Sequence, residues 1–173
     1  MTIGLIDLDT GNLASLKSAM IKLNIKFKVC KKKFDFEKID KIIMPGVGAF
    51  KDLYKRVIDT GIDKILLEKV EKKQSILGIC VGFQVLFSSS SEHGYSKGLN
   101  ILDGSFQNFS EIKKEIPIPH VGWNECVYNK KSNLFYDIEN KSDYYFTHSY
   151  FLNNCNENYI LSKTKYHLDF VSS

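Results

Sequence analysis

Short apolar runs and longer amphipathic segments alternate along the first half of the chain. The apolar runs predict strands, and the segments whose apolar residues recur every three or four positions predict helices. Strands are expected at residues 2–7, 27–30, 41–45 and 75–79, and helices at 12–23, 50–58, 61–72 and 81–89. Strands that alternate with helices in this way predict an α/β fold with a mostly parallel central sheet and flanking helices.

Polar and turn-forming residues mark two of the junctions between these elements. Asn12 precedes the first helix and is expected to cap its N-terminus. Pro45 and Gly46 are expected to stop the third strand in a sharp loop. Ligands bind at the carboxyl ends of the strands in open parallel sheets, so this loop is a candidate part of a binding site.

After about residue 92 the pattern changes to short runs rich in Tyr, Phe, Asn and Gly. These runs predict added antiparallel strands and loops, packed on the same sheet, rather than more crossover helices. Residues 129–133 and 153–158 are expected to form surface loops. A chain of 173 residues fits one domain with a full core, so residues 1–173 are interpreted as a single domain.

Composition and charge exclude several classes of function. Apolar residues make up 43% and charged residues 25%, as in an ordinary globular protein. The net charge of +4 comes almost entirely from Lys, and with Arg56 as the only arginine a nucleic-acid partner is not expected. The start lacks a basic leader and no apolar stretch could span a bilayer, so we expect a cytoplasmic protein that does not bind membranes.

The segment Gly78-Ile79-Cys80-Val81-Gly82 has the pattern of a nucleophile elbow between a strand and a helix. Glycines are needed on both sides of such a turn because a Cβ would clash there. A helix N-terminus favours the thiolate of Cys80, and the N–H of Val81 is expected to form half of an oxyanion hole. The alternative for this segment alone is a buried structural cysteine in a tight turn.

The segment "PGVG", residues 45–48, would lie at the same edge of the sheet. Its glycine-rich backbone could aim an N–H at the same oxygen, which makes it a candidate second half of the oxyanion hole. The alternative is an ordinary Pro-Gly turn. Covalent chemistry at a cysteine needs no organic cofactor, and the cysteines and histidines are too dispersed for a metal site, so neither is expected.

Six segments in order give the chain a resemblance to a known family. They are "DxxxGNLxSLxxA", "IIMPGVGAF", "LGICVGFQVLF", "GLNILDGSF", "IPHVGWNE" and "YYFTHSYF". Together they resemble the glutaminase subunit of imidazole glycerol phosphate synthase, a class I glutamine amidotransferase of histidine biosynthesis. The resemblance spans essentially the whole chain and implies a flavodoxin-like fold, L-glutamine as substrate, and a heterodimer with a (βα)8-barrel cyclase subunit that receives the ammonia.

The resemblance also implies a role for each matching residue. The implied nucleophile is Cys80, the implied oxyanion residues are Val47 and Val81, and the implied glutamine-binding residues are Gly46, Gly48, Gln84, His148, Ser149 and Tyr150. The implied partner-facing residues are Asn12, His120, Trp123 and Asn124.

The sequence departs from the family pattern at its end. The family's general base and its orienting carboxylate lie in a His-Pro-Glu motif, and the sequence stops at "FVSS", the segment that normally leads up to it. We expect a chain truncated short of the motif or a degenerate subunit, and in either case impaired turnover of glutamine. His167 and Asp169 have the spacing of a base and its orienter, but they precede this segment, and the alternative is an ordinary surface loop.

Two other functions stay open at this point. A paralogous glutaminase subunit could supply ammonia to a sugar amidotransferase in surface-glycan biosynthesis. A binding subunit without hydrolytic activity would account for the absent motif, although the intact elbow at Cys80 argues against it.

Overall fold

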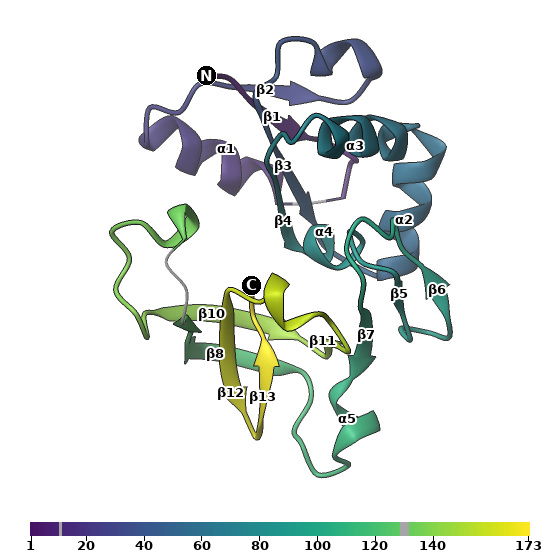
Figure 1. Ribbon diagram of the computed structural model, residues 1–173, viewed down its shortest axis with the longest axis vertical. Coiled ribbons are helices and arrows are strands. Elements are labelled where there is room, and N and C mark those ends of the chain that lie inside the picture. The colour runs from purple at the N-terminus through teal and green to yellow at the C-terminus, as the bar shows by residue number, and fades with distance from the viewer. Residues whose placement is uncertain (11, 129–131) are drawn as a thin grey trace. The chain divides into compact units, whose positions relative to one another are not determined.

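The chain forms two compact units in a computed structural model that describes residues 1–10, 12–128 and 132–173 (Figure 1). The first unit comprises residues 1–90 and 95–102, and the second comprises residues 91–94 and 103–173. That residues 1–173 act as one domain stays a prediction.

A four-stranded parallel sheet forms the centre of the first unit, with strand order β2-β1-β3-β4. Its strands are β1 (Ile3–Ile6), β2 (Phe27–Cys30), β3 (Lys41–Gly46) and β4 (Ile76–Cys80). Its long helices are α1 (Leu13–Lys22), α2 (Phe50–Asp59) and α3 (Ile62–Glu71), and the 3-10 turn η1 (Lys33–Phe36) follows β2. The predicted parallel sheet with flanking helices is confirmed.

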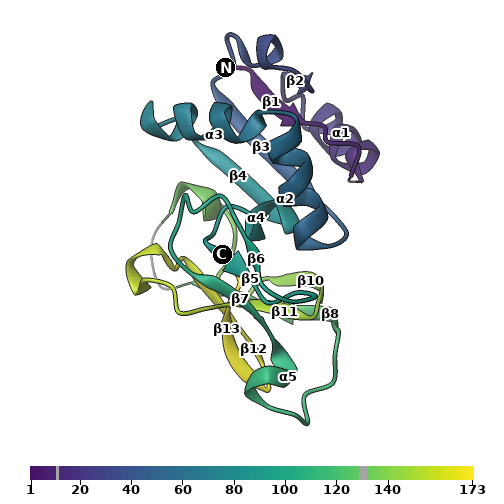
Figure 2. The ribbon, with the colours of Figure 1, turned by 90° about the vertical axis from the view of Figure 1, so that its right-hand side faces the viewer.

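The helices of this unit cover both faces of the sheet. Helix α1 lies on one face, and α2 and α3 lie on the other (Figures 1 and 2). The chain moves from β1 to β2 in one direction and from β3 to β4 in the other, and right-handed crossovers in opposite directions put their helices on opposite faces. The strand order therefore reverses between β1 and β3, and in such sheets the carboxyl edge near the reversal is where ligands bind.

Burial follows the predicted patterns on α2 but not on α1. The side chains of Phe50, Leu53 and Val57 are fully buried, at the spacing of one helical face. On α1 only Met20 is buried, and Leu23, the C-cap three residues further along, is exposed. Helix α1 is tied down instead at its start, where the Asn12 side chain caps it by accepting from the Ser15 N–H at 3.4 Å, as predicted.

Strand β3 includes Pro45 and ends at Gly46, so the prediction that these two residues stop the strand is confirmed. The N–H of Ile42 donates toward the β4 side, to the carbonyl of Ser75 at 2.9 Å. Successive N–H groups of a strand point alternately to its two neighbouring strands, so an N–H at position 45 would point to β1. The pairing of β1 with β3 has already ended at Ile43. The N–H that proline lacks therefore has no strand partner there, and β4 continues to pair as far as Gly46.

The helix after β4 is shorter than predicted. Helix α4 (Val81–Gln84) has four residues, where a helix over 81–89 was expected, and the hairpin β5 (Ser89–Ser90) and β6 (Ser96–Lys97) follows. The carbonyls that a longer α4 would use accept hydrogen bonds from the later residues Leu99 and Asn100 instead. Val85 accepts from the N–H of Leu99, and Phe87 accepts from the N–H of Asn100.

The second unit consists mainly of antiparallel strands. They are β7 (Ser105–Asn108), β8 (His120–Glu125), β9 (Val127–Tyr128), β10 (Asp143–His148), β11 (Tyr150–Asn153), β12 (Ser162–Tyr166) and β13 (Leu168–Val171). The helical turns are α5 (Phe109–Ile112), η2 (Asn133–Phe135) and η3 (Glu157–Tyr159). Part of the predicted loop at 129–133, residues 129–131, lies outside the described residues, and the predicted loop at 153–158 runs from the end of β11 into η3.

These strands pair with one another. Strands β7, β11, β13, β12 and β9 are neighbours in that order, and β8 pairs with β10 in a separate ribbon. The added antiparallel strands are confirmed, and they form ladders separate from the parallel sheet. That they pack on the parallel sheet stays a prediction. Short antiparallel connections such as the one from β12 to β13, with a single residue between the strands, bring neighbours in sequence together as partners.

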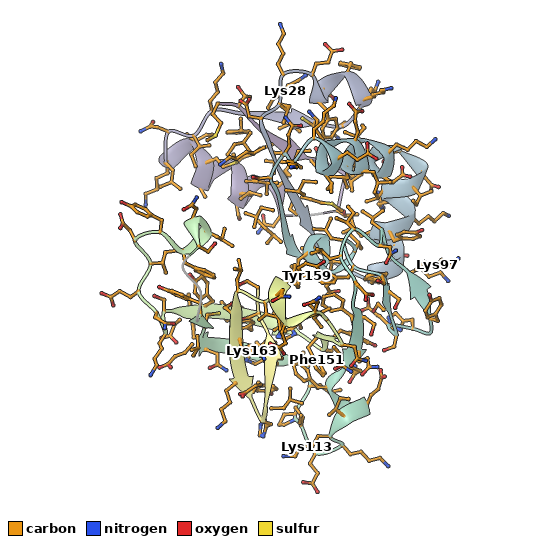
Figure 3. All side chains as sticks on the ribbon, viewed as in Figure 1. Lys28, Lys97, Lys113, Phe151, Tyr159 and Lys163 are labelled. Carbon is orange, nitrogen blue, oxygen red and sulfur yellow. The ribbon has the colours of Figure 1, made fainter. Side chains whose placement is uncertain are left out.

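The core of the second unit is aromatic. Phe109, Ile116, Phe151 and Phe170 are buried, and Phe146, Tyr166 and Leu168 pack against them. Phe151 points into this unit, while the side chains of Lys28, Lys97 and Lys113 extend outward from the ribbon (Figure 3). In the part of the chain that the structure describes, no helix has the length and apolar character needed to cross a membrane.

Candidate active site

Cys80 lies at a strained junction between a strand and a helix. It is the last residue of β4 and the N-cap of α4, with φ 55° and ψ −122°. Side chains other than glycine rarely adopt a positive φ, and such strain is typical of functional sites. The predicted elbow is thus confirmed in its geometry. The role of Cys80 as a nucleophile stays a prediction.

The two glycines of the elbow allow close packing of α4 on the sheet. A Cβ at Gly82 would lie 2.0 Å from the carbonyl oxygen of Met44, and a Cβ at Gly78 would lie 2.5 Å from the Cα of Phe83. Both contacts are with backbone, which cannot rotate away as a side chain can. The predicted reason for these glycines, that a Cβ would clash, is confirmed.

The loop after β3 meets the elbow at the carboxyl edge of the sheet. Gly46 is the register partner of Cys80 across the β3–β4 ladder, so the two residues are neighbours on adjacent strands. Val47 follows with an exposed side chain, and Gly48 has a φ of 90°, which favours glycine. The first unit therefore brings the PGVG segment next to Cys80 and Val81.

The short length of α4 changes one part of the sequence argument. A macrodipole grows with aligned peptide units, and α4 contributes a single turn. Any stabilisation of a thiolate or an oxyanion at Cys80 thus depends on the first N–H groups of that turn, which an α-helix leaves without intrahelical partners. Gln84, an implied glutamine-binding residue, ends the same turn and is half-buried.

Exposure separates Cys80 from the other cysteines. All four are thiols, and Cys80 is the exposed one. Burial raises the pKa of Cys30 to about 11, with the nearby Asp35 carboxylate adding to the effect. Burial also raises the pKa of Cys155, and Cys126 is buried beside Thr164, 3.3 Å from its hydroxyl. Since the thiolate is the reactive form, the structure favours Cys80 as the reactive cysteine.

The remaining implied glutamine-binding residues, His148, Ser149 and Tyr150, lie in the second unit. They form the passage from β10 to β11, where the chain leaves the ribbon with β8 and begins to pair with β7. The carbonyl of Ser149 accepts from the N–H of Phe109 at 3.1 Å, which fixes the backbone at this point.

A buried histidine and a half-buried one meet across the β8–β10 ribbon, which the sequence analysis did not foresee. His120 and His148 are register partners, and Nδ1 of His120 lies 3.0 Å from Nε2 of His148. His120 is 3% exposed and lies between the rings of Tyr166 and Phe146, with centroids 3.9 and 5.0 Å away. Burial lowers the pKa of His120 to about 4, with repulsion from His148 adding to the effect, and burial also lowers the pKa of His148.

The histidine pair predicts a loss of stability in acid. Above pH 6.5 His120 is neutral in both the folded and the unfolded chain, so it adds no pH dependence. Below that pH the unfolded chain takes up a proton and the folded chain does not until about pH 4, so the free energy of unfolding falls. A pKa gap of about 2.5 corresponds to a loss of about 3 kcal/mol by pH 4.

Urea unfolding at a series of pH values between 7 and 4 would measure this loss. The chain has one tryptophan, Trp123, whose fluorescence reports on β8. A His120→Phe variant is the control, because the carboxylates of the chain also titrate in this range and would affect both proteins. Equal slopes of stability against pH in the two proteins would contradict the assignment to His120.

The implied partner-facing residues differ in how they lie. Trp123 is 72% exposed, whereas the Asn124 side chain donates to the carbonyl of Lys165 at 2.9 Å. His120 is buried, so its imidazole is not on the surface of the second unit. That these four residues face a partner stays a prediction. Asn12, in the first unit, caps α1.

Sequence reasoning missed an exposed neighbour of Trp123. Tyr145 is its register partner on β10, and their rings meet edge to face with centroids 5.6 Å apart. Val121 lies on the same face of the ribbon, two residues before Trp123, and is also exposed. The alternation within 120–125 and 143–148 could have identified this face, but not the pairing between the two strands.

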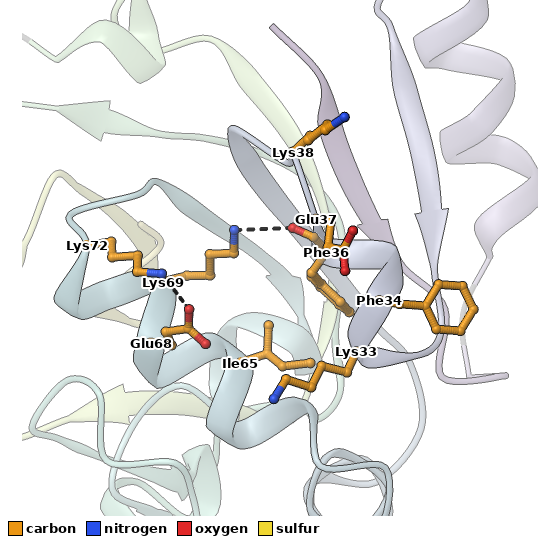
Figure 4. Close-up of a pocket in the computed structure, with 9 residues that line it drawn as sticks. All are labelled: Lys33, Phe34, Phe36, Glu37, Lys38, Ile65, Glu68, Lys69 and Lys72. Atoms are coloured by element: carbon orange, nitrogen blue, oxygen red, sulfur yellow. Dashed lines mark hydrogen bonds and ion pairs between the residues drawn. The ribbon is translucent and has the colours of Figure 1, made fainter.

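An open hollow of about 570 Å³ lies between η1 and α3 in the first unit (Figure 4). Lys69 reaches across it to the carbonyls of Phe36 and Ile39, at 3.3 and 3.4 Å, and Lys72 pairs with Glu68. Lys72 precedes the start of β4, whereas Cys80 ends that strand, so the hollow lies toward the opposite edge of the sheet. It is not part of the candidate active site.

The residues that the structure describes offer no metal centre: no group of three or more His, Cys, Asp or Glu side chains among them could hold an ion. His167 lies at the tip of the β12–β13 connection with a φ of 55°. Within the described chain it makes no hydrogen bond to Asp169, so the geometry gives no support to this pair as a base and its orienter.

Comparison with known proteins connects this geometry to a family. Residues 4–169 match the family model of class-I glutamine amidotransferases. Imidazole glycerol phosphate synthase subunit HisH 1 of Campylobacter jejuni subsp. jejuni is 38% identical over 172 residues, which cover 99% of this chain and 85% of that protein. Imidazole glycerol phosphate synthase subunit HisH of Oceanobacillus iheyensis is 38% identical over 165 residues, covering 95% of this chain and 80% of that protein.

Solved structures support the fold. A crystal structure of a glutamine amidotransferase matches with a TM-score of 0.71 at 17% identity, covering 94% of this chain and 84% of that chain. A glutamine amidotransferase from Thermotoga maritima matches with a TM-score of 0.62 at 13% identity, covering 96% of this chain and 71% of that chain.

Proposed function

The chain belongs to the class-I glutamine amidotransferase family, and we propose that it is the glutaminase subunit of an imidazole glycerol phosphate synthase. In this role it hydrolyses L-glutamine to glutamate and ammonia. The observation that carries the proposal is the strained, exposed Cys80 on an elbow whose register partner is Gly46 of the PGVG loop.

The chemistry follows from this arrangement. The sulfur of Cys80 attacks the side-chain amide carbon of glutamine, and the carbonyl oxygen takes up the negative charge. The N–H of Val81 and a backbone N–H of the Gly46–Gly48 loop, with Val47 at its centre, would donate to that oxygen. When the tetrahedral intermediate collapses, the C–N bond breaks and the nitrogen, which takes up the proton that the thiol gives up, leaves as ammonia. Water then cleaves the glutamyl thioester, which releases glutamate and restores the thiol.

The ammonia would pass to a (βα)8-barrel cyclase subunit, which uses it to form imidazole glycerol phosphate and aminoimidazole carboxamide ribonucleotide. The relatives named as subunits of that synthase support a partner of this kind. The exposed ring pair of Trp123 and Tyr145 supports a docking role for the outer face of the β8–β10 ribbon. A cytoplasmic location fits this pathway and is part of the proposal.

Isotope transfer tests the proposal and separates it from the other two functions. We expect the chain, mixed with the cyclase subunit of its own organism and the cyclase substrate, to move 15N from amide-labelled glutamine into the imidazole product. Two-dimensional NMR of the product would detect the label. Label in an amidated sugar nucleotide instead would favour the glycan pathway, and glutamine left intact with both acceptors would favour a binding subunit without hydrolytic activity.

A further inference from the structure

The hydrogen bonds of the histidine pair fix the proton positions on both rings. Nδ1 of His148 lies 2.8 Å from the carbonyl oxygen of Tyr150, and a carbonyl oxygen only accepts, so this Nδ1 carries the proton. In a neutral ring Nε2 is then an acceptor. The Nδ1 of His120, 3.0 Å away, must therefore be the donor to His148.

The packing around His120 holds this donor in one orientation. Its ring is nearly parallel to that of Tyr166, with an interplanar angle of 22°, and to that of Phe146, with an angle of 17°. The hydroxyl of Tyr166 donates to the carbonyl of Pro117 at 2.8 Å, which fixes the stacked ring in turn. The rings packed on His120 come from β10, β12 and β13, and apart from His148 they carry no basic group.

His148, the acceptor in this pair, lies where the backbone changes direction between two strands. His148 is the last residue of β10, and Tyr150 is the first residue of β11 in a different ladder. The bond from Nδ1 of His148 to the Tyr150 carbonyl closes this turn around Ser149. A His148 ring in the other tautomer would present a lone pair to that carbonyl, and the turn would lose its closing bond.

We propose that His120 is a positioning residue for glutamine binding: by donating to Nε2 of His148 it stabilises the Nδ1–H tautomer that bonds to the Tyr150 carbonyl, and so holds the turn 148–150. The inference rests on the proposed function, because that turn carries the residues implied to bind glutamine. It gives His120 a role inside the second unit, in place of the partner contact that the resemblance implied. His120 itself touches no substrate in this proposal and acts through His148.

Two substitutions of His120 separate hydrogen bonding from packing. Phenylalanine keeps an aromatic ring between Tyr166 and Phe146 but has no donor. Asparagine loses the ring but can present an amide N–H near the position of the imidazole Nδ1. A positioning role predicts that His120→Asn is closer to the wild type than His120→Phe, and a packing role predicts the reverse order.

The readout is covalent labelling of Cys80 by a diazoketone analogue of glutamine, followed by mass spectrometry. We expect His120→Phe to raise the half-saturating concentration of the analogue about tenfold, as expected for the loss of one well-formed hydrogen bond, with the maximal labelling rate changed less than about twofold. We expect His120→Asn to recover most of the affinity. An unchanged concentration in His120→Phe, or a larger rise in His120→Asn, would overturn the proposal.

Histidine-selective 15N NMR of the wild-type chain tests the proton positions without any substitution. The expected result is the Nδ1–H tautomer for His148, and an Nε2–H tautomer would overturn the proposal even if a variant failed to fold. In the labelling experiment His93→Asn is the matched control for His120→Asn. His93 is an exposed histidine with a φ of 54°, which asparagine tolerates. Absence of labelling in the wild-type chain would count against the proposed function, whereas equal labelling of wild type and His120→Phe would count against this inference alone.

Discussion

Replacing Cys80 by alanine is expected to abolish glutamine hydrolysis while leaving the fold and the binding of glutamine in place. Without the sulfur the remaining groups cannot form the covalent intermediate, so hydrolysis should fall to the uncatalysed background. Alanine deletes the sulfur and leaves the backbone of the elbow unchanged. The φ of 55° at this position is equally strained for both residues, so the two proteins should unfold at similar urea concentrations.

Two measurements check this expectation. Glutamate release, coupled to glutamate dehydrogenase, should fall to the background rate in the presence of the partner subunit. Mass spectrometry should find the adduct of the diazoketone analogue on Cys80 in the wild type and no adduct in Cys80→Ala. Calorimetric titration with L-glutamine should give a Kd within about threefold of the wild-type value, since the pocket keeps its other contacts.

Cys155→Ala is the matched control for the nucleophile. Cys155 is half-exposed, and burial raises its pKa, so its thiol should react slowly. The control should keep both labelling and hydrolysis. An adduct that persists in Cys80→Ala, or that disappears in Cys155→Ala, would mean that the reactive thiol has been assigned to the wrong residue.

The elbow could be predicted from sequence because its cause is local. Glycines on both sides of Cys80, a preceding apolar run and a following amphipathic run specify a tight strand-to-helix turn within a few residues. The neighbouring PGVG loop was predictable for a related reason, since parallel strands that alternate with helices bring their carboxyl ends to one edge. Both inferences needed only the order of the elements.

The histidine pair could not be predicted because its cause is long-range. His120 and His148 are brought together by the register of two antiparallel strands, β8 and β10, which are not consecutive in the chain. A shift of that register by one residue would turn the two side chains to opposite faces of the ribbon. The sequence shows two strands with alternating side chains, but it does not show which residues stand opposite each other.

The overestimated helix after Cys80 has the same origin. The run from Val81 onward has good helical periodicity, and local propensity alone favours its continuation. The structure ends the helix at Gln84 because the backbone N–H groups of residues 99–102 donate to the carbonyls of residues 85–87. A tertiary contact outweighed local propensity here, and sequence periodicity contains no information about it.

Replacing Gly82 by alanine is expected to destabilise the first unit by about 4 kcal/mol, near the upper end for a single substitution. The added Cβ would lie 2.0 Å from the carbonyl oxygen of Met44 and 2.9 Å from its carbonyl carbon. Met44 is fully buried in β3, which is paired on both sides by β1 and β4. The strand has no room to move, so α4 must lift from the sheet instead.

That movement connects stability to function. Val81 starts α4 directly after Cys80, so a helix that lifts carries the N–H of Val81 away from the elbow. We therefore expect slower labelling of Cys80 in Gly82→Ala even under conditions where most of the protein is folded. Urea unfolding followed by far-UV circular dichroism would measure the stability, and the labelling rate at low urea would measure the displacement of the donor.

Gly61→Ala separates the clash from the general effect of losing a glycine. Gly61 has a φ of 69° and nothing within 4 Å of a Cβ placed there, so alanine should cost only about 1 kcal/mol for its left-handed backbone. It also lies in the first unit, at the start of α3, away from the elbow. If Gly82→Ala were no more destabilising than Gly61→Ala, α4 would not be seated on the backbone of β3, and the donor geometry proposed for Val81 would have to be abandoned with it.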